Sequence, residues 1–169
     1  MTLAIELQGG GSVRLRFESA TLGAAGGPGD DGLHSPWSIE GEVDWRNAEA
    51  LRLVSALFED GCELAIASIR PRGAAGHDTD VVTSHLLEGG ERVAVDEALV
   101  STEYDPAGLP RRLGIELWID PDSPPLRVAA DREGALEAGG EGLRREVARM
   151  RFRLAGTPGT GLYEVLRPA

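Results

Sequence analysis

Alternation of apolar and polar residues runs along most of the chain and predicts β-strands. In "SVRLRFESATL" (12–22), Val13, Leu15 and Phe17 alternate with arginine and glutamate, which is the period-two pattern of a sheet with one wet face. The stretch "WSIEGEVDW" alternates in the same way, and its glycine, Gly41, predicts a bend. Both stretches are therefore expected to be strands whose apolar side faces a core.

Two hairpins and four further strands follow by the same reasoning. Asp-Gly between "LRLVSALF" and "CELAIASI" suits a tight turn, and "EGGE" separates "TDVVTSHLL" from "RVAVDEALVSTEY". The remaining predicted strands are 111–120, 126–131, 145–154 and 161–167, with "GTPGT" as the turn before the last. About ten or eleven strands at intervals of roughly 8 to 12 residues predict an all-β sandwich or barrel with few or no helices.

Two segments leave the assignment open. Residues 46–58 have a helix-friendly content of Ala, Glu and Leu, and Gly61 would suit a helix C-cap, but we favour a strand. Residues 133–149 carry several glycines, which favour a loop, and a short helical turn before Val147 is the alternative.

Composition narrows the class of protein. A chain of 169 residues fits a single domain, residues 1–169, with one core. The net charge is −11 and all 17 basic residues are arginine, so we expect no nucleic-acid partner, because a phosphate backbone needs a basic face. Cys62 is the only cysteine, which excludes an internal disulfide and a cysteine-based metal site. Without a signal peptide or a run of about 18 apolar residues, we expect a cytoplasmic protein that does not enter the membrane.

Motifs for known chemistries are absent. The chain has no G-x-S-x-G elbow, no phosphate-binding loop with Gly-Lys and no H-E-x-x-H helix, so no cofactor is predicted. His77, Asp78 and Asp80 are the best metal candidates, but on a strand the two aspartates and the histidine would face opposite sides. We therefore interpret them as a solvated polar loop and predict no metal site.

His85 is a candidate for proton transfer. Val81, Thr83, His85 and Leu87 alternate along a predicted strand, and if this row points inward, the imidazole is its one group that titrates near neutral pH. The alternative is a hydrogen-bonded core histidine.

Glu164 is the second candidate for catalysis. It lies between Leu162 and Leu166 in the last strand, so that it points into the barrel if they do. A desolvated carboxyl has a raised pKa and can act as a general acid. The alternative is an internal ion pair with Arg149 or Arg70.

Aromatic side chains are candidates for an apolar ligand cavity, although alternating aromatics in strands are usually core residues. The candidates are Phe17, Trp37, Trp45, Trp118 and Phe152.

Part of the chain resembles a known family. "LFEDGCELAIASIRPRG", "PRRLGIELW" and "RMRFRLAGTPGTGLYEVLR" are similar to the C-terminal half of the AttH and hydroxyneurosporene synthase (carotenoid 1,2-hydratase) family, whose last strand ends in "G.G..E", here Gly159, Gly161 and Glu164. The similarity covers residues 45–167. It implies a single lipocalin-like antiparallel β-barrel, of about 8–11 strands, around a hydrophobic ligand, with relatives that hydrate, isomerise or cyclise polyene or terpenoid-like substrates.

The resemblance leaves two functions open. Family members usually have two barrel halves in a chain about twice as long, so this chain is a single-barrel relative, a homodimer or a binding remnant. The first hypothesis is a hydratase, isomerase or cyclase in which Glu164 protonates a polyene, terpenoid or polyketide-like substrate while Asp44 or His85 positions water or takes a proton. The second is a non-catalytic lipocalin-like module that binds an apolar small molecule or another protein.

Overall fold

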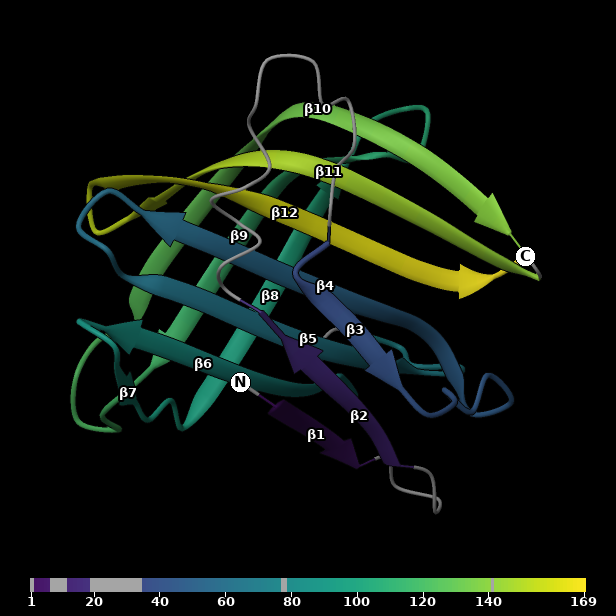
Figure 1. The fold of residues 1–169 in the computed structure, drawn as a ribbon, viewed down its shortest axis with the longest axis horizontal. Helices are drawn as coiled ribbons and strands as arrows, with labels where there is room; N and C mark the ends of the chain where they lie inside the picture. The colour runs from purple at the N-terminus through teal and green to yellow at the C-terminus, as the bar shows by residue number, and fades with distance from the viewer. Residues whose placement is uncertain (1, 7–11, 19–34, 77–78, 141) are drawn as a thin grey trace.

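The computed structural model describes residues 2–6, 12–18, 35–76, 79–140 and 142–169, most of which lie in antiparallel strands. These residues contain no α-helix, and hence none long and apolar enough to cross a membrane. The all-β, antiparallel fold predicted for the chain is confirmed, and its main sheet curls in a lipocalin-like manner (Figure 1).

Nine strands form this large curled sheet. They are β4 (Ala48–Phe58), β5 (Glu63–Pro71), β6 (Val81–Glu88), β7 (Glu91–Val93), β8 (Glu97–Tyr104), β9 (Pro110–Trp118), β10 (Leu126–Gly140), β11 (Leu143–Leu154) and β12 (Thr157–Pro168). Their order in the sheet is β7-β6-β5-β4-β12-β11-β10-β9-β8. The last strand therefore pairs with β4, the first strand of this sheet, and lies at its centre.

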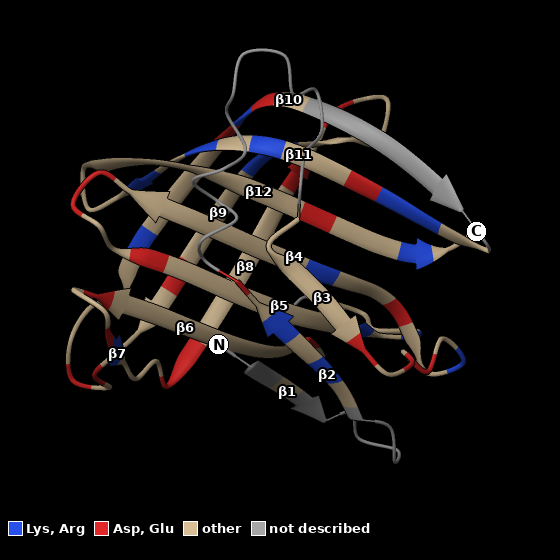
Figure 2. Cartoon of the chain, viewed as in Figure 1, with Lys and Arg blue, Asp and Glu red and all other residues tan. Residues whose placement is uncertain are grey.

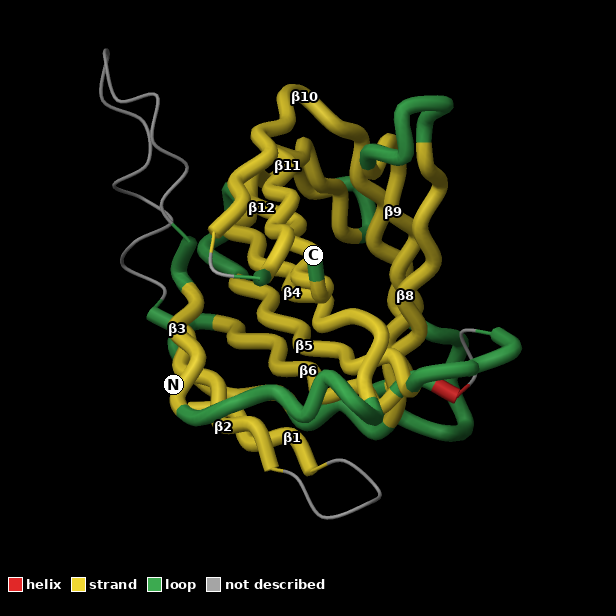
Figure 3. The backbone as a smooth tube through the Cα atoms, turned by 90° about the vertical axis from the view of Figure 1, so that its right-hand side faces the viewer, coloured by secondary structure: helices red, strands yellow, loops and turns green. Residues whose placement is uncertain are grey.

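A small sheet packs on the outside of the large one. It consists of β1 (Thr2–Glu6), β2 (Ser12–Phe17) and β3 (Trp37–Glu40), in the order β1-β2-β3. Figure 3 shows it beside β4, β5 and β6, outside the curl of the large sheet. The outer face of those strands is thus covered, whereas the outer face of β8–β11 has no second layer among the described residues.

The large sheet curls without closing. Its edge strands are β7 and β8, and β6 contacts β8 without forming a hydrogen-bonded ladder with it. The curled sheet is therefore a half-barrel. Its two edges face each other at a seam between β6 and β8.

Two apolar cores follow from this arrangement. The inner core lies on the concave face and draws on strands from both sides of the curl, including Val54, Ile66, Ile115, Phe152 and Tyr163. The outer core lies between the two sheets, where Val13, Leu15, Phe17 and Trp37 pack on Leu51, Leu53, Ala67 and Leu166. Even-numbered residues of β4 from Ala50 onward face inward and odd-numbered ones face outward, as the period of two requires.

The structure shows the secondary structure of the two segments whose assignment was left open. Residues 48–58 are strand β4, as favoured, because the segment is buried on both faces between the two cores. The loop predicted within 133–149 is wrong up to residue 140 and again from residue 143, since β10 runs to Gly140 and pairs from Val128 onward with β11, which begins at Leu143. The turn predicted at "GTPGT" is shifted, because β12 begins at Thr157 and the reversal is at Ala155 and Gly156, which both have positive φ. Gly41, with a φ of 101°, ends β3 at the predicted bend.

Two glycines let β12 approach β4 closely. A Cβ atom on Gly161 would overlap the carbonyl oxygen of Ser55 and lie 2.8 Å from the Cα atom of Ala56. A Cβ atom on Gly159 would lie 2.6 Å from a ring carbon of Phe58. No side chain fits at Gly161, because the atoms it would meet belong to the backbone of the neighbouring strand.

We expect Gly161→Ala to lower the free energy of unfolding by about 3 kcal/mol or more, because β12 must move away from β4 to admit the methyl group. Gly134→Ala is the matched control, since a Cβ atom there meets no atom within 4 Å and the backbone is compatible with an L-residue. It should change stability by less than about 1 kcal/mol. Urea denaturation of both variants measures this, and equal stabilities would contradict the close approach.

Candidate functional site

The concave face carries a group of buried and half-buried polar side chains near one end of the half-barrel. We call this the inner polar cluster, and its members are Arg52, Ser68, Asp80, Thr102, Glu146 and Tyr163. Arg52 and Tyr163 come from the adjacent central strands β4 and β12, while Thr102 comes from β8 on the other side of the seam. The cluster therefore links strands that are distant in the order of the sheet.

Arg52 is the centre of the cluster. Its guanidinium is buried and forms an ion pair with Asp80, whose side chain is 1% exposed. The same Nη2 atom donates to the hydroxyl of Ser68 at 3.2 Å, and Nη1 approaches the carbonyl oxygen of Val100 on β8 at 3.5 Å. Arg52 thus connects β4 with β5, with the residue just before β6 and, across the seam, with β8.

Tyr163 forms the second link across the concave face. Its hydroxyl lies 3.0 Å from the hydroxyl of Thr102 on β8. Burial, reinforced by the neighbouring phenol of Tyr104, raises the pKa of Tyr163 above its usual value. Tyr163 is therefore a neutral hydroxyl at physiological pH, able to donate or accept a hydrogen bond but not to act as a base.

Glu146 places a carboxylate on the concave face. It is 3% exposed and alternates along β11 with Ala148, Met150 and Phe152 of the inner core. Its Oε1 atom pairs with Nε of Arg144 at 3.1 Å, whereas its Oε2 atom is buried without a hydrogen-bond partner. A buried carboxylate oxygen without a partner is uncommon in a stable core.

Glu164 does not point into the half-barrel, so the predicted facing is wrong. Leu166, which shares its side of β12, belongs to the outer core, while Tyr163 and Val165 face inward. Glu164 is fully buried, accepts a hydrogen bond from the hydroxyl of Ser35 at 2.5 Å and pairs with Arg145. The alternative of an ion pair is the correct one, although its partner is neither Arg149 nor Arg70.

His85 also lies on the outer face of the large sheet. It pairs in register with Ala65 of the outer core, while its neighbour Leu86 faces the inner core, so the predicted inward row is wrong. Arg92 donates to its Nε2 atom at 3.4 Å, and its Nδ1 atom has no partner. Burial, aided by the positive charge of Arg92, lowers the pKa of His85 to about 4, which keeps the ring neutral at pH 7.

Asp44 stabilises a turn between β3 and β4. Its carboxylate accepts hydrogen bonds from the backbone and side chain of Arg46, both at 3.1 Å, and from Nδ2 of Asn47 at 2.9 Å. The side-chain bond from Arg46 is the main reason that the pKa of Asp44 lies below its usual value. The structure does not bring Asp44, His85 and Glu164 together, since His85 and Glu164 lie on strands separated by β5 and β4.

The five aromatic candidates do not line one cavity. Phe17 and Trp37 are in contact within the outer core, with tilted rings whose centroids are 5.1 Å apart, and Trp45 packs against that core. Trp118 is half-buried at the end of β9 and belongs to neither core. Phe152 alone lies on the concave face, with its ring edge-on to Phe58 at 6.5 Å.

The predicted polar loop before β6 is also corrected. His77 and Asp78 lie outside the described residues, but Asp80 is buried against Arg52 and is not solvated. No group of three or more potential metal ligands occurs in the part of the chain that the structure describes. Cys62 is buried in the inner core, where burial raises its pKa to about 11 and leaves the thiol unreactive.

Sequence reasoning missed Arg52 and Glu146, two buried charged residues that face inward. Arg52 interrupts the apolar run "LRLVSALF", and an arginine within a strand buried on both faces signals a buried ion pair. Glu146 lies where the predicted loop 133–149 and the predicted strand 145–154 overlap, and its facing was not assigned.

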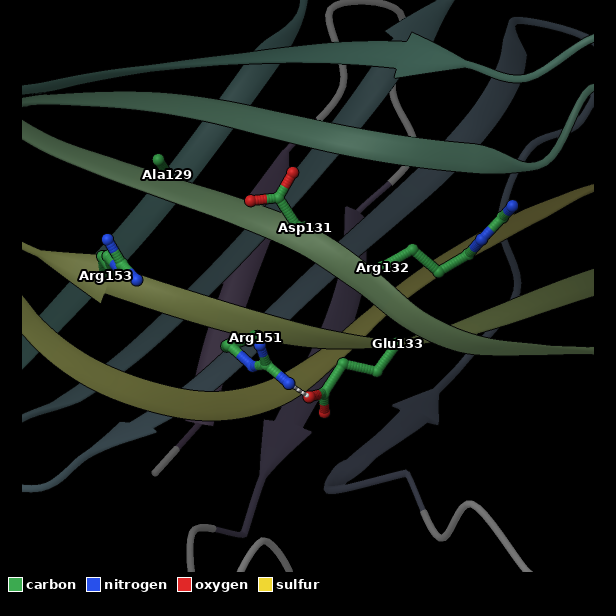
Figure 4. Close-up of a pocket in the computed structure, with 6 residues that line it drawn as sticks. All are labelled: Ala129, Asp131, Arg132, Glu133, Arg151 and Arg153. Atoms are coloured by element: carbon green, nitrogen blue, oxygen red, sulfur yellow. Dashed lines mark hydrogen bonds and ion pairs between the residues drawn. The ribbon is translucent and has the colours of Figure 1, made fainter.

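Grooves on the outer face of β8–β11 offer a second location. One, of about 560 Å³, is lined by Ala129, Asp131, Arg132, Glu133, Arg151 and Arg153, and Figure 4 shows Glu133 paired with Arg151 across β10 and β11. Another, of about 680 Å³, continues from it past Ala129 and Arg153 to Leu99 on β8. Most of their charged residues are exposed, and Figure 2 shows arginines on both sides of a single acidic residue on β11. Exposed ion pairs of this kind are ordinary surface features.

Comparison with known proteins adds no identification. No protein-family model matches the chain, and no curated protein matches it significantly.

We expect Arg52→Leu to lower the free energy of unfolding by about 3–5 kcal/mol, because it leaves the carboxylate of Asp80 buried without its cation. The double variant Arg52→Leu/Asp80→Leu should recover most of this loss, since an apolar pair removes both charges. Chemical denaturation of the two single variants and the double variant measures the coupling. Additive losses would show that the two residues do not form a buried pair.

We expect His85 to make stability depend on pH between about 6.5 and 4. The unfolded chain binds a proton at the imidazole from pH 6.5 downward, whereas the folded protein resists it until about pH 4, so stability falls as the pH is lowered through this range. The loss should reach about 2–3 kcal/mol relative to His85→Gln, which cannot titrate there. If the free energies of unfolding of the two proteins changed equally with pH over this range, the buried neutral state of His85 would be contradicted.

Proposed function

We propose that the protein binds a hydrophobic small molecule of polyene, terpenoid or polyketide type on the concave face of the large sheet, with the inner polar cluster at the polar end of the ligand. The observation that carries this proposal is Arg52, a buried guanidinium on a concave face that is largely apolar outside the inner polar cluster. Burying a charge is costly, and perturbed or buried charges concentrate at functional sites. Apolar clefts with a few convergent polar groups are typical ligand sites.

The composition of the inner core supports access for a ligand. Ala50, Ala56, Ala98, Ala130 and Ala148 all face the concave side, so small residues occupy positions where barrels of this size carry either bulky core residues or a ligand. The seam between β6 and β8 has no ladder of hydrogen bonds, so the two edges can separate without breaking backbone pairs. Tyr104, which is 41% exposed at the end of β8, lies beside Tyr163 at the rim of this end.

Proton-transfer chemistry on the bound ligand is the second candidate, and Glu146 is the carboxyl placed for it. Its buried Oε2 atom faces the concave side, whereas Glu164 is separated from that side by the sheet itself. Hydration, isomerisation or cyclisation would therefore use Glu146 as its acid, in place of Glu164. Both functions require binding on the concave face.

We expect N-phenyl-1-naphthylamine, an apolar fluorescent probe, to bind the protein and shift the ¹³C methyl signal of Met150, which is fully buried in the inner core. Ala130→Leu should weaken binding by about tenfold or more, because its added methyl groups occupy the concave face. Ala129→Leu is the matched control, because the adjacent residue is exposed on the outer face.

Fluorescence titration and methyl NMR of the three proteins measure both effects. An unshifted Met150 signal, or binding lost in Ala129→Leu and kept in Ala130→Leu, would contradict the proposal and place the ligand in the outer groove.

A further inference from the structure

The outer face of β8–β11 carries its side chains in three rows that run across the strands. Each row is fixed by the residue-by-residue pairing of β11 with β10, β10 with β9 and β9 with β8. Read from β11 to β8, the first row is Arg151, Asp131, Arg112 and Glu103, the second is Arg153, Ala129, Gly114 and Ser101, and the third, which starts on β10, is Arg127, Glu116 and Leu99. Figure 4 shows the β10 and β11 members of the first two rows. Charges alternate in sign along the first and third rows, and the second row consists of small residues except for Arg153.

The ion pairs within these rows are weak by themselves. Arg112 pairs with Asp131 at 2.9 Å and Arg127 pairs with Glu116 at 3.4 Å, and each of the four side chains is at least 39% exposed. Exposed pairs of this kind contribute little to stability. The three rows together contain four arginines and three acids, whereas the whole chain has a net charge of −11. Two copies of the chain therefore repel each other less through this face than through the rest of their surfaces.

The alternation of charge makes the face complementary to itself. A twofold axis parallel to the strands, between β9 and β10, reverses the order of the strands and keeps each row at its own height, so that β10 lies over the partner's β9 and β11 over the partner's β8. Arg127 then faces the partner's Glu116, and Asp131 faces the partner's Arg112. Each contact occurs twice by symmetry, so each exposed ion pair becomes part of a network of four alternating charges.

The residues at the margin of the face select this axis. A twofold axis perpendicular to the strands would also match the central charges, but it would place Arg153 against the partner's Arg153 and leave Arg151 without an opposing acid. With the axis parallel to the strands, Arg151 faces the partner's Glu103. Arg153, the one long side chain of the second row, faces the partner's Ser101, so a long side chain meets a small one.

We propose that the outer face of β8–β11 is an interface with a second copy of this chain, formed by face-to-face packing of the two sheets about a twofold axis parallel to the strands. This face has no second layer among the described residues, and the interface also covers Leu99, which is 38% exposed. Four strands of about eight residues present about 500 Å² on each copy, which is at the lower end for a specific interface and corresponds to a dimer of micromolar affinity. The interface and the proposed ligand site lie on opposite faces of the sheet, and neither depends on the other.

Sedimentation velocity from about 1 to 100 μM protein at low ionic strength tests the interface. The wild-type protein should form dimers, and Arg127→Glu and Glu116→Arg should each weaken them by about tenfold or more, because each variant sets like charges against each other at two symmetric contacts. An equimolar mixture of the two variants should dimerise again, since each copy then faces a partner of opposite charge. Repulsion within one chain cannot produce this recovery.

The control for the change of charge is Arg16→Glu. Arg16 is an exposed arginine paired with Glu40 on the small sheet, so its replacement changes the net charge equally but should leave dimerisation unchanged. The double variant Arg127→Glu/Glu116→Arg should also dimerise like the wild-type protein, which shows that both substitutions are tolerated by the fold. A wild-type monomer at 100 μM, dimers of either single variant as stable as wild-type dimers, or a mixture that stays monomeric would each overturn the proposal.

Discussion

Burial of the central strands on both faces is the constraint on which the rest of this structure depends. β4, β5 and β12 lie between the inner core and the small outer sheet, so Leu53 packs outward while Val54 packs inward. Strands of this kind need continuous apolar sequence instead of alternation, which explains "LRLVSALF" and "ELAIASI". The helix-friendly composition of residues 46–58 has no effect against this burial, because packing on two faces outweighs intrinsic propensity.

Because both faces are buried, polar side chains in these strands depend on partners on their own side of the sheet. On the outer side, Glu164 is bonded by Arg145 and Ser35, which fixes the segment before β3 against the centre of the large sheet. On the inner side, Arg52 is paired with Asp80 and reaches β8 across the seam. The first arrangement is complete and connects two layers, whereas the second leaves Nε of Arg52 and Oε2 of Glu146 without partners. Since an incomplete polar network is costly, a ligand that bonded to either atom would stabilise the inner side.

The sequence predicted the fold better than the site, for one physical reason. A period of two shows which residues share a face, and turn glycines such as Gly61 and Gly89 mark where hairpins reverse, so the strands and their antiparallel pairing were predictable. The period does not show which face is the interior when both faces are buried. Glu164 and His85 were therefore placed on the wrong side, although their neighbours were grouped correctly. Asp80 and Arg52, 28 residues apart in the chain, meet only because β5 and β6 pair beside β4.

The residues of the "G.G..E" ending of the last strand have two different structural roles, close backbone packing and an ion pair on the outer face. Gly159 and Gly161 are required by the contact between β12 and the backbone of β4, a packing requirement on the central pair of strands. Glu164, three residues later, faces the outer layer and holds Arg145 and Ser35. All three residues thus have structural explanations, and none of them faces the interior of the half-barrel with a free polar group. Any chemistry on the concave face must come from residues outside this motif, and Arg52, Glu146 and Tyr163 are the side chains whose burial and facing suit it.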